Sequence, residues 1–152
     1  KIQTWKGTPD LDRFGDNHAT CDVKCPFTRL SFCTLIDAWE KGGIDTVRKD
    51  HAEGDTYYWQ LVSNAILTNN KFAELIVFCP YQSQLDDVRT IARMYDGADV
   101  YKYFWLGNSN DEELPYLLDG GYYKNLNVMR FEIPETDKLH LTELVLKAEA
   151  LI

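Results

Sequence analysis

The chain has 152 residues, of which 45% are hydrophobic and 26% are charged, as expected for one folded domain. It has no apolar run of the roughly 18 residues that span a membrane, which excludes a transmembrane helix. The formal net charge of −8 argues against general, non-specific binding to nucleic acid. Residues 1–30 nevertheless hold five basic and four acidic side chains, so the acidity lies in the remainder of the chain.

The first predicted elements form a β-hairpin. Alternation of apolar and polar residues predicts a strand over Ile2–Trp5, which Gly7 and Pro9 end. Residues 12–17 contain Asp, Gly and Asn and predict a turn. His18–Cys25 alternates again, so we expect a half-buried strand that pairs with the first.

Two helices are predicted next. Apolar residues at helical spacing predict a helix over Thr28–Lys41, closed by Gly42 and Gly43. The polar residues 44–56 predict a connector. A second apolar stripe predicts a helix over Tyr57–Leu67.

The second half of the chain alternates between strands and helices. Leu75–Cys79 is continuous and apolar, which is typical of a central strand covered on both faces. The remaining predictions are a helix over Gln84–Tyr95, an aromatic strand or extended segment over Val100–Leu106, a loop over Asn108–Gly121, a strand over Val128–Ile133 and a helix over Thr136–Leu151. The residues of this last helix that are expected to face inward are Leu139, Leu141, Leu144, Val145 and Ala148. This order predicts an α/β fold with a mixed β-sheet flanked by helices.

The four cysteines form no C-x-x-C pair, and their spacing fits neither a zinc site nor an iron–sulfur site. We therefore expect buried or half-buried thiols in a reducing compartment, which places the protein in the cytoplasm. The cysteines are Cys21, Cys25, Cys33 and Cys79.

Two carboxylates and one ammonium group are expected to meet at the hairpin. Asp22 and Lys24 share one face of the predicted strand, and pairing of the strands can bring Asp10 beside Asp22. Two carboxylates can hold Mg²⁺, and the carbonyl of Val23 can add a ligand. A neighbouring lysine can position the attacking water and offset charge on a phosphate. The alternative is a surface ion pair worth about 0–1 kcal/mol.

Three segments together resemble the PD-(D/E)xK nuclease superfamily. They are Gly7-Thr8-Pro9-Asp10, Asp22-Val23-Lys24-Cys25-Pro26-Phe27-Thr28 and Tyr57-Tyr58-Trp59-Gln60-Leu61. More narrowly, they are similar to the phage lambda exonuclease and YqaJ-type viral recombinase group. In that group a Cys-Pro-Phe-Thr run follows the catalytic lysine, and a glutamine lies on the next core helix.

The resemblance implies a restriction-endonuclease-like core and a Mg²⁺- or Mn²⁺-dependent exonuclease that acts on double-stranded DNA ends. It makes Asp10 and Asp22 the metal ligands, with the carbonyl of Val23, and Lys24 the group that activates water. Gln60 would orient the site. The implied partners are duplex DNA and a single-strand annealing protein used in recombination, and a homo-oligomer is left open.

The resemblance also implies what precedes Lys1. Members of the group carry an upstream helix with a further acidic residue and basic groups for the terminal phosphate. We therefore expect residues 1–152 to be a single nuclease domain that lacks this N-terminal segment. The second acidic position is Asp22, where glutamate is commoner.

Other readings stay open at this point. The chain can be a non-catalytic DNA-binding or assembly domain with the same fold, or an endonuclease or resolvase of the same superfamily. From spacing alone, Gln60 is a polar residue on the solvent side of its helix. The aromatic runs 57–59 and 101–105 can stack on an unpaired DNA strand, although core packing is favoured. His18 can approach the metal, whereas His51 and His140 have no assigned role.

Overall fold

The computed structural model describes residues 5–13, 18–97 and 100–151. Its strands are β1 (Leu11–Arg13), β2 (Ala19–Lys24), β3 (Phe72–Phe78) and β4 (Leu126–Glu132). Its helices are α1 (Arg29–Asp50), α2 (Gly54–Thr68), α3 (Leu85–Met94), α4 (Val100–Asn108) and α5 (Glu135–Glu149). Short 3-10 helices cover Gln82–Gln84 and Asp111–Glu113.

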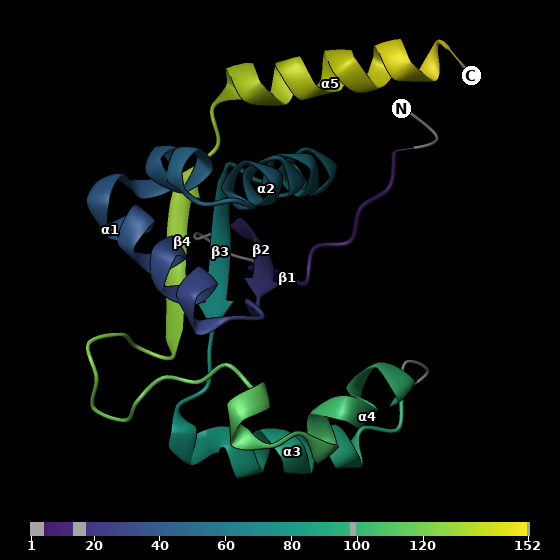
Figure 1. The fold of residues 1–152 in the computed structure, drawn as a ribbon. Helices are drawn as coiled ribbons and strands as arrows, with labels where there is room; N and C mark the ends of the chain where they lie inside the picture. Colours follow the sequence, from purple (N-terminus) through teal and green to yellow (C-terminus); the bar gives the residue numbers. More distant parts are fainter. Residues whose placement is uncertain (1–4, 14–17, 98–99, 152) are drawn as a thin grey trace.

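The strands form one mixed sheet in the order β1-β2-β3-β4 (Figure 1). β2 and β3 are parallel, and the two outer pairs are antiparallel. The chain passes from β2 to β3 through α1 and α2, which cover one face of the sheet. The predicted α/β class with a mixed sheet and flanking helices is therefore confirmed.

The hydrophobic core lies between the sheet and these two helices. Leu75 and Val77 of β3 are fully buried against Leu35 of α1 and Leu61 of α2. Full burial of one such side chain contributes about 1.5–3 kcal/mol. Because side chains alternate along a strand, Asp22 faces the same side as Leu75, its partner in the sheet. The core therefore holds the strand that carries Asp22 against α2.

The predicted hairpin differs from the observed one in its first strand. Trp5 is not in a strand, and its indole donates a hydrogen bond to Ser63 of α2 at 2.9 Å. The strand that pairs with β2 is instead β1, which begins at Leu11, one residue before the predicted turn 12–17, and continues into it. Residues 2–4 of the predicted strand and 14–17 of the predicted turn lie outside the described residues. Alternation alone did not show which stretch would pair with β2.

The predicted connector over residues 44–56 is mostly helical. Helix α1 bends at Gly42 and Gly43, where Gly43 has a φ of 64°, and then continues to Asp50. Beyond the bend, Ile44 and Val47 lie one turn apart and pack against the core. This burial accounts for the helix among residues that are otherwise polar.

The aromatic segment predicted as a strand over Val100–Leu106 is helix α4. It packs against α3, and the two lie beyond the end of the sheet to which the arrow of β3 points (Figure 1). A short aromatic run has strong strand propensity but no decisive periodicity, so its tertiary partner determines its structure.

Helix α5 is present as predicted, but its leucines do not all face inward. Leu139 is 58% exposed and Leu144 is 47% exposed. The helix lies against α2, where Tyr58 donates a hydrogen bond to Asp137 and Trp59 contacts the ring of His140. Because α5 packs mainly against one helix, α2, only part of its apolar surface is covered.

All four cysteines are free, and Cys21 and Cys79 are buried as expected. Burial raises the pKa of Cys79 to about 11, so this thiol stays protonated at neutral pH. Cys25 is exposed, contrary to the expectation. Among the described residues, no helix combines the length and apolar character needed to cross a membrane.

Candidate active site

The pairing of β1 with β2 places Asp10 beside Asp22. Leu11 pairs with Cys21, so Asp10, which directly precedes β1, is next to Asp22 in the same antiparallel register. The Asp10 carboxylate accepts a hydrogen bond from the backbone N–H of Val23 at 2.8 Å. This bond fixes the exposed carboxylate at the end of the sheet, next to the buried one.

Asp22 is only 2% exposed, and its Oδ2 lies 2.7 Å from Nζ of Lys24. Burial raises the pKa of Asp22, Lys24 opposes the rise, and the neighbouring Asp10 carboxylate adds to it. Burial therefore dominates over the single ion pair. A second positive charge between the two carboxylates would offset the free-energy cost of burying the charged Asp22 side chain.

Helix α2 completes the cluster with Gln60. The amide oxygen of Gln60 accepts a hydrogen bond from Lys24 Nζ at 3.0 Å, and its nitrogen donates to Asp22 Oδ1 at 3.4 Å. Gln60 is exposed, as predicted from spacing alone for a polar residue on the solvent side of its helix. Its amide group nevertheless points into the cluster. The Gln60 side chain thus orients both the carboxylate of Asp22 and the ammonium group of Lys24.

Tyr57 is a further member of the cluster, which the sequence identified only as part of an aromatic run and not as a contact of Lys24. Nζ of Lys24 lies 5.0 Å from the centroid of its ring, in the geometry of a cation–π contact. Tyr57 precedes Gln60 by three residues, so both lie on the same face of α2. That spacing is the signal that could have identified it.

The donor set suits a hard divalent cation. In a strand, the N–H and C=O of one residue point to the same side, so the carbonyl of Val23 faces the side of Asp10. The described residues hold no group of three His, Cys, Asp or Glu side chains able to bind a metal. Mg²⁺ is commonly held by one or two carboxylates and several waters, so two carboxylates with one carbonyl fit it.

His18 is not brought to this site. It is exposed and lies four residues before Asp22, which is roughly 13 Å along an extended strand.

His51 makes a structural contact within α1 and its C-terminal cap. Its Nδ1 accepts a hydrogen bond from the backbone N–H of Glu53 at 3.2 Å, and its Nε2 lies 3.1 Å from Ser31 Oγ. A neutral ring that accepts at Nδ1 carries its proton on Nε2, so it donates to the serine. His51 therefore cannot act as a base toward Ser31, and no hydrolytic dyad is formed there.

Substitution of His51 by asparagine is expected to change how stability depends on pH. Burial lowers the pKa of His51, so its contribution to stability is present above about pH 6.5 and is lost as the pH falls through the folded-state pKa. Urea unfolding at pH 7.5 should give a higher free energy of unfolding for wild type than for His51→Asn, and this difference should be smaller at pH 5.5. A gap that is equal at both pH values would contradict this assignment.

No family model matches the chain, and a search of curated proteins returned no match. What indicates the chemistry of the chain is therefore the motif in its sequence together with the geometry of Asp10, Asp22, Lys24 and Gln60.

Proposed function

We propose that the protein is a metal-dependent deoxyribonuclease that hydrolyses DNA from duplex ends. The observation that supports this is that residues from three separate segments of the sequence meet in one cluster. They are Asp10, Asp22, Lys24 and Gln60. These are the residue types and positions of the PD-(D/E)xK resemblance.

In this proposal Asp10, Asp22 and the carbonyl of Val23 hold the cation. A bound Mg²⁺ or Mn²⁺ would supply positive charge at the scissile phosphate. Hydrolysis joins the oxygen of water to phosphorus and breaks the P–O bond to the departing oxygen. One proton of the water ends on the departing oxygen, and the other stays with the new phosphate hydroxyl. Lys24, an ion-pair partner of Asp22, acts as a hydrogen-bond donor that positions the water and offsets phosphate charge. Gln60 positions Lys24 through its 3.0 Å hydrogen bond.

The alternative is a DNA-binding or assembly domain without catalysis. It is favoured by the ion pair between Asp22 and Lys24, because each of these two charges already has a partner of opposite charge within the protein. Under the nuclease proposal, a single-strand annealing protein is the natural partner, because digestion from one end exposes a single strand for it. The same proposal places the protein in the cytoplasm.

The test compares linear, blunt-ended duplex DNA with a covalently closed circle of the same sequence, each in Mg²⁺. An exonuclease should release nucleotides from the linear DNA and leave the circle intact. Nicking of the circle would indicate an endonuclease of the same chemistry. Binding of either DNA without any cleavage would reject the nuclease and favour the alternative.

A further inference from the structure

An apolar cavity of about 360 Å³ lies between the ends of β2 and β3 and the pair α3 and α4. Aromatic side chains form much of its wall, namely Phe27, Phe78, Tyr103 and Trp105. Its volume falls in the range of about 300–1,000 Å³ found for small-molecule sites. The space outside the carboxyl ends of parallel strands is also where α/β proteins commonly bind ligands.

This cavity is continuous in sequence with the candidate active site. Cys25, Pro26 and Phe27 line it, and they directly follow Lys24. The described residues that line it include none with a charge, whereas Lys24, which precedes the lining residue Cys25 in the sequence, carries an ammonium group. An uncharged ring can therefore occupy the cavity while an attached anionic group lies toward Lys24.

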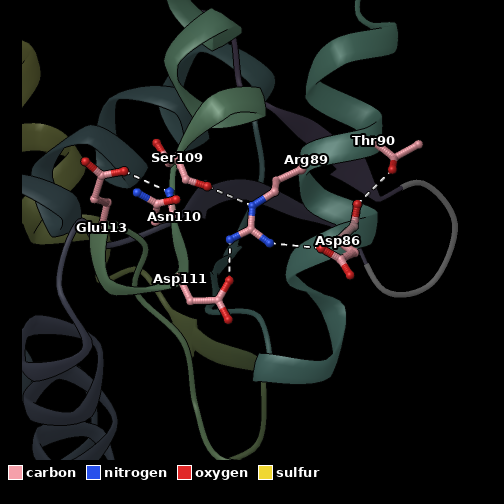
Figure 2. Close-up of polar contacts among 7 residues, drawn as sticks. All are labelled: Asp86, Arg89, Thr90, Ser109, Asn110, Asp111 and Glu113. Atoms are coloured by element: carbon pink, nitrogen blue, oxygen red, sulfur yellow. Dashed lines mark hydrogen bonds and ion pairs between the residues drawn. The ribbon is translucent and has the colours of Figure 1, made fainter.

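Helix α3 supplies Leu85 and Val88 to the far wall of the cavity and also carries Arg89, whose polar contacts are shown in Figure 2. Its Nε donates to the carbonyl of Ser109 at 2.9 Å, and its guanidinium pairs with both Asp86 and Asp111. These contacts tie α3 to the segment that follows α4. The wall that carries Tyr103 and Trp105 is thus fixed before any ligand arrives, which lowers the entropic cost of binding.

The aromatic side chains of α4 are exposed, so the expectation that residues 101–105 pack in the core is wrong. Tyr101 is 70% exposed, Phe104 is 73% exposed and Trp105 is 47% exposed. Phe27, across the cavity, is 85% exposed. Of these rings, only Trp105 and Phe27 line the cavity, and exposed aromatic rings that line such a cavity are the kind of surface on which unpaired bases stack.

We propose that this cavity binds one unpaired nucleobase of a DNA strand whose adjoining phosphate lies at Lys24. The inference rests on the proposed function and extends it, because the substrate strand is then unpaired where it passes the site. Stacking against Trp105 and Phe27 supplies the binding, and the uncharged wall accepts any of the four bases.

The experiment measures binding of a fluorescent single strand of about eight nucleotides, in EDTA so that cleavage cannot occur. Trp105→Ala is expected to weaken binding about tenfold. Phe104→Ala is the matched control, because Phe104 is on the same helix but does not line the cavity, and its binding should be unchanged. Phe27→Ala repeats the test at a highly exposed position, where folding is not at risk.

A strand with an abasic residue at one position provides the decisive comparison. At the position that enters the cavity, loss of the base should weaken wild-type binding but leave the binding of Trp105→Ala unchanged. Equal binding by Trp105→Ala, Phe104→Ala and wild type would overturn the inference, as would a wild type that does not bind the single strand. Self-association that Trp105→Ala abolishes, with DNA binding unaffected, would instead assign the cavity to a second copy of the chain.

These outcomes are separable from the test of nuclease activity. Trp105-dependent binding without cleavage would retain the base site and reject the nuclease. Cleavage by wild type with no effect of Trp105→Ala or Phe27→Ala on binding would retain the nuclease and reject the base site.

Discussion

Asp22→Asn and Lys24→Ala are each expected to reduce cleavage of linear duplex DNA by about a hundredfold or more, equivalent to about 2.7 kcal/mol of activation free energy. Asp22 is one of two carboxylates proposed to hold the cation. Lys24 is the charged donor next to it, at 2.7 Å. Single-turnover rates with saturating protein measure the effect on the chemical step.

Lys41→Ala provides a matched control for the charge change. Lys41 is exposed on α1 and pairs with Asp50 at 3.2 Å, away from the cluster, so its loss should leave the rate unchanged. Circular dichroism and urea unfolding would establish that each variant is folded. Rates like that of wild type for either Asp22→Asn or Lys24→Ala would reject the assigned roles and favour the non-catalytic alternative.

The second large effect concerns the identity of the cation. Mg²⁺ and Mn²⁺ are expected to support cleavage, EDTA to abolish it, and Ca²⁺ to bind without turnover. Ca²⁺ is larger and accepts looser coordination, which would misplace the attacking water. Calorimetric titration of each cation into the protein measures binding, and single-turnover assays measure cleavage.

The cysteines supply the control for this prediction. Replacement of Cys21, Cys33 and Cys79 by alanine or serine should leave metal binding unchanged, although removal of a buried thiol can lower stability. Zinc-dependent activity that these substitutions abolish would contradict the carboxylate site.

The sequence by itself predicted the mixed α/β class and the residues of the candidate site. Local rules were sufficient for this, because residues two apart on a strand share a face and a helix repeats every 3.6 residues. Asp22 and Lys24 therefore had to be neighbours wherever β2 was placed. Hairpin pairing added Asp10, and the motif added Gln60, whose distance from β2 along the chain local rules cannot bridge.

Only the tertiary structure decided which segments meet. The register of β1 places Asp10 beside Asp22, and packing of α2 on the sheet brings Gln60 to within 3.0 Å of Lys24. Residues 100–108 form a helix because α3 offers a surface to pack against, although their aromatic composition favours a strand. Which strands pair, and whether a segment forms a helix or a strand, depends here on partners far away in the sequence. The apolar surface that these contacts bury contributes to stability only once the chain has folded, so local sequence patterns do not reveal it.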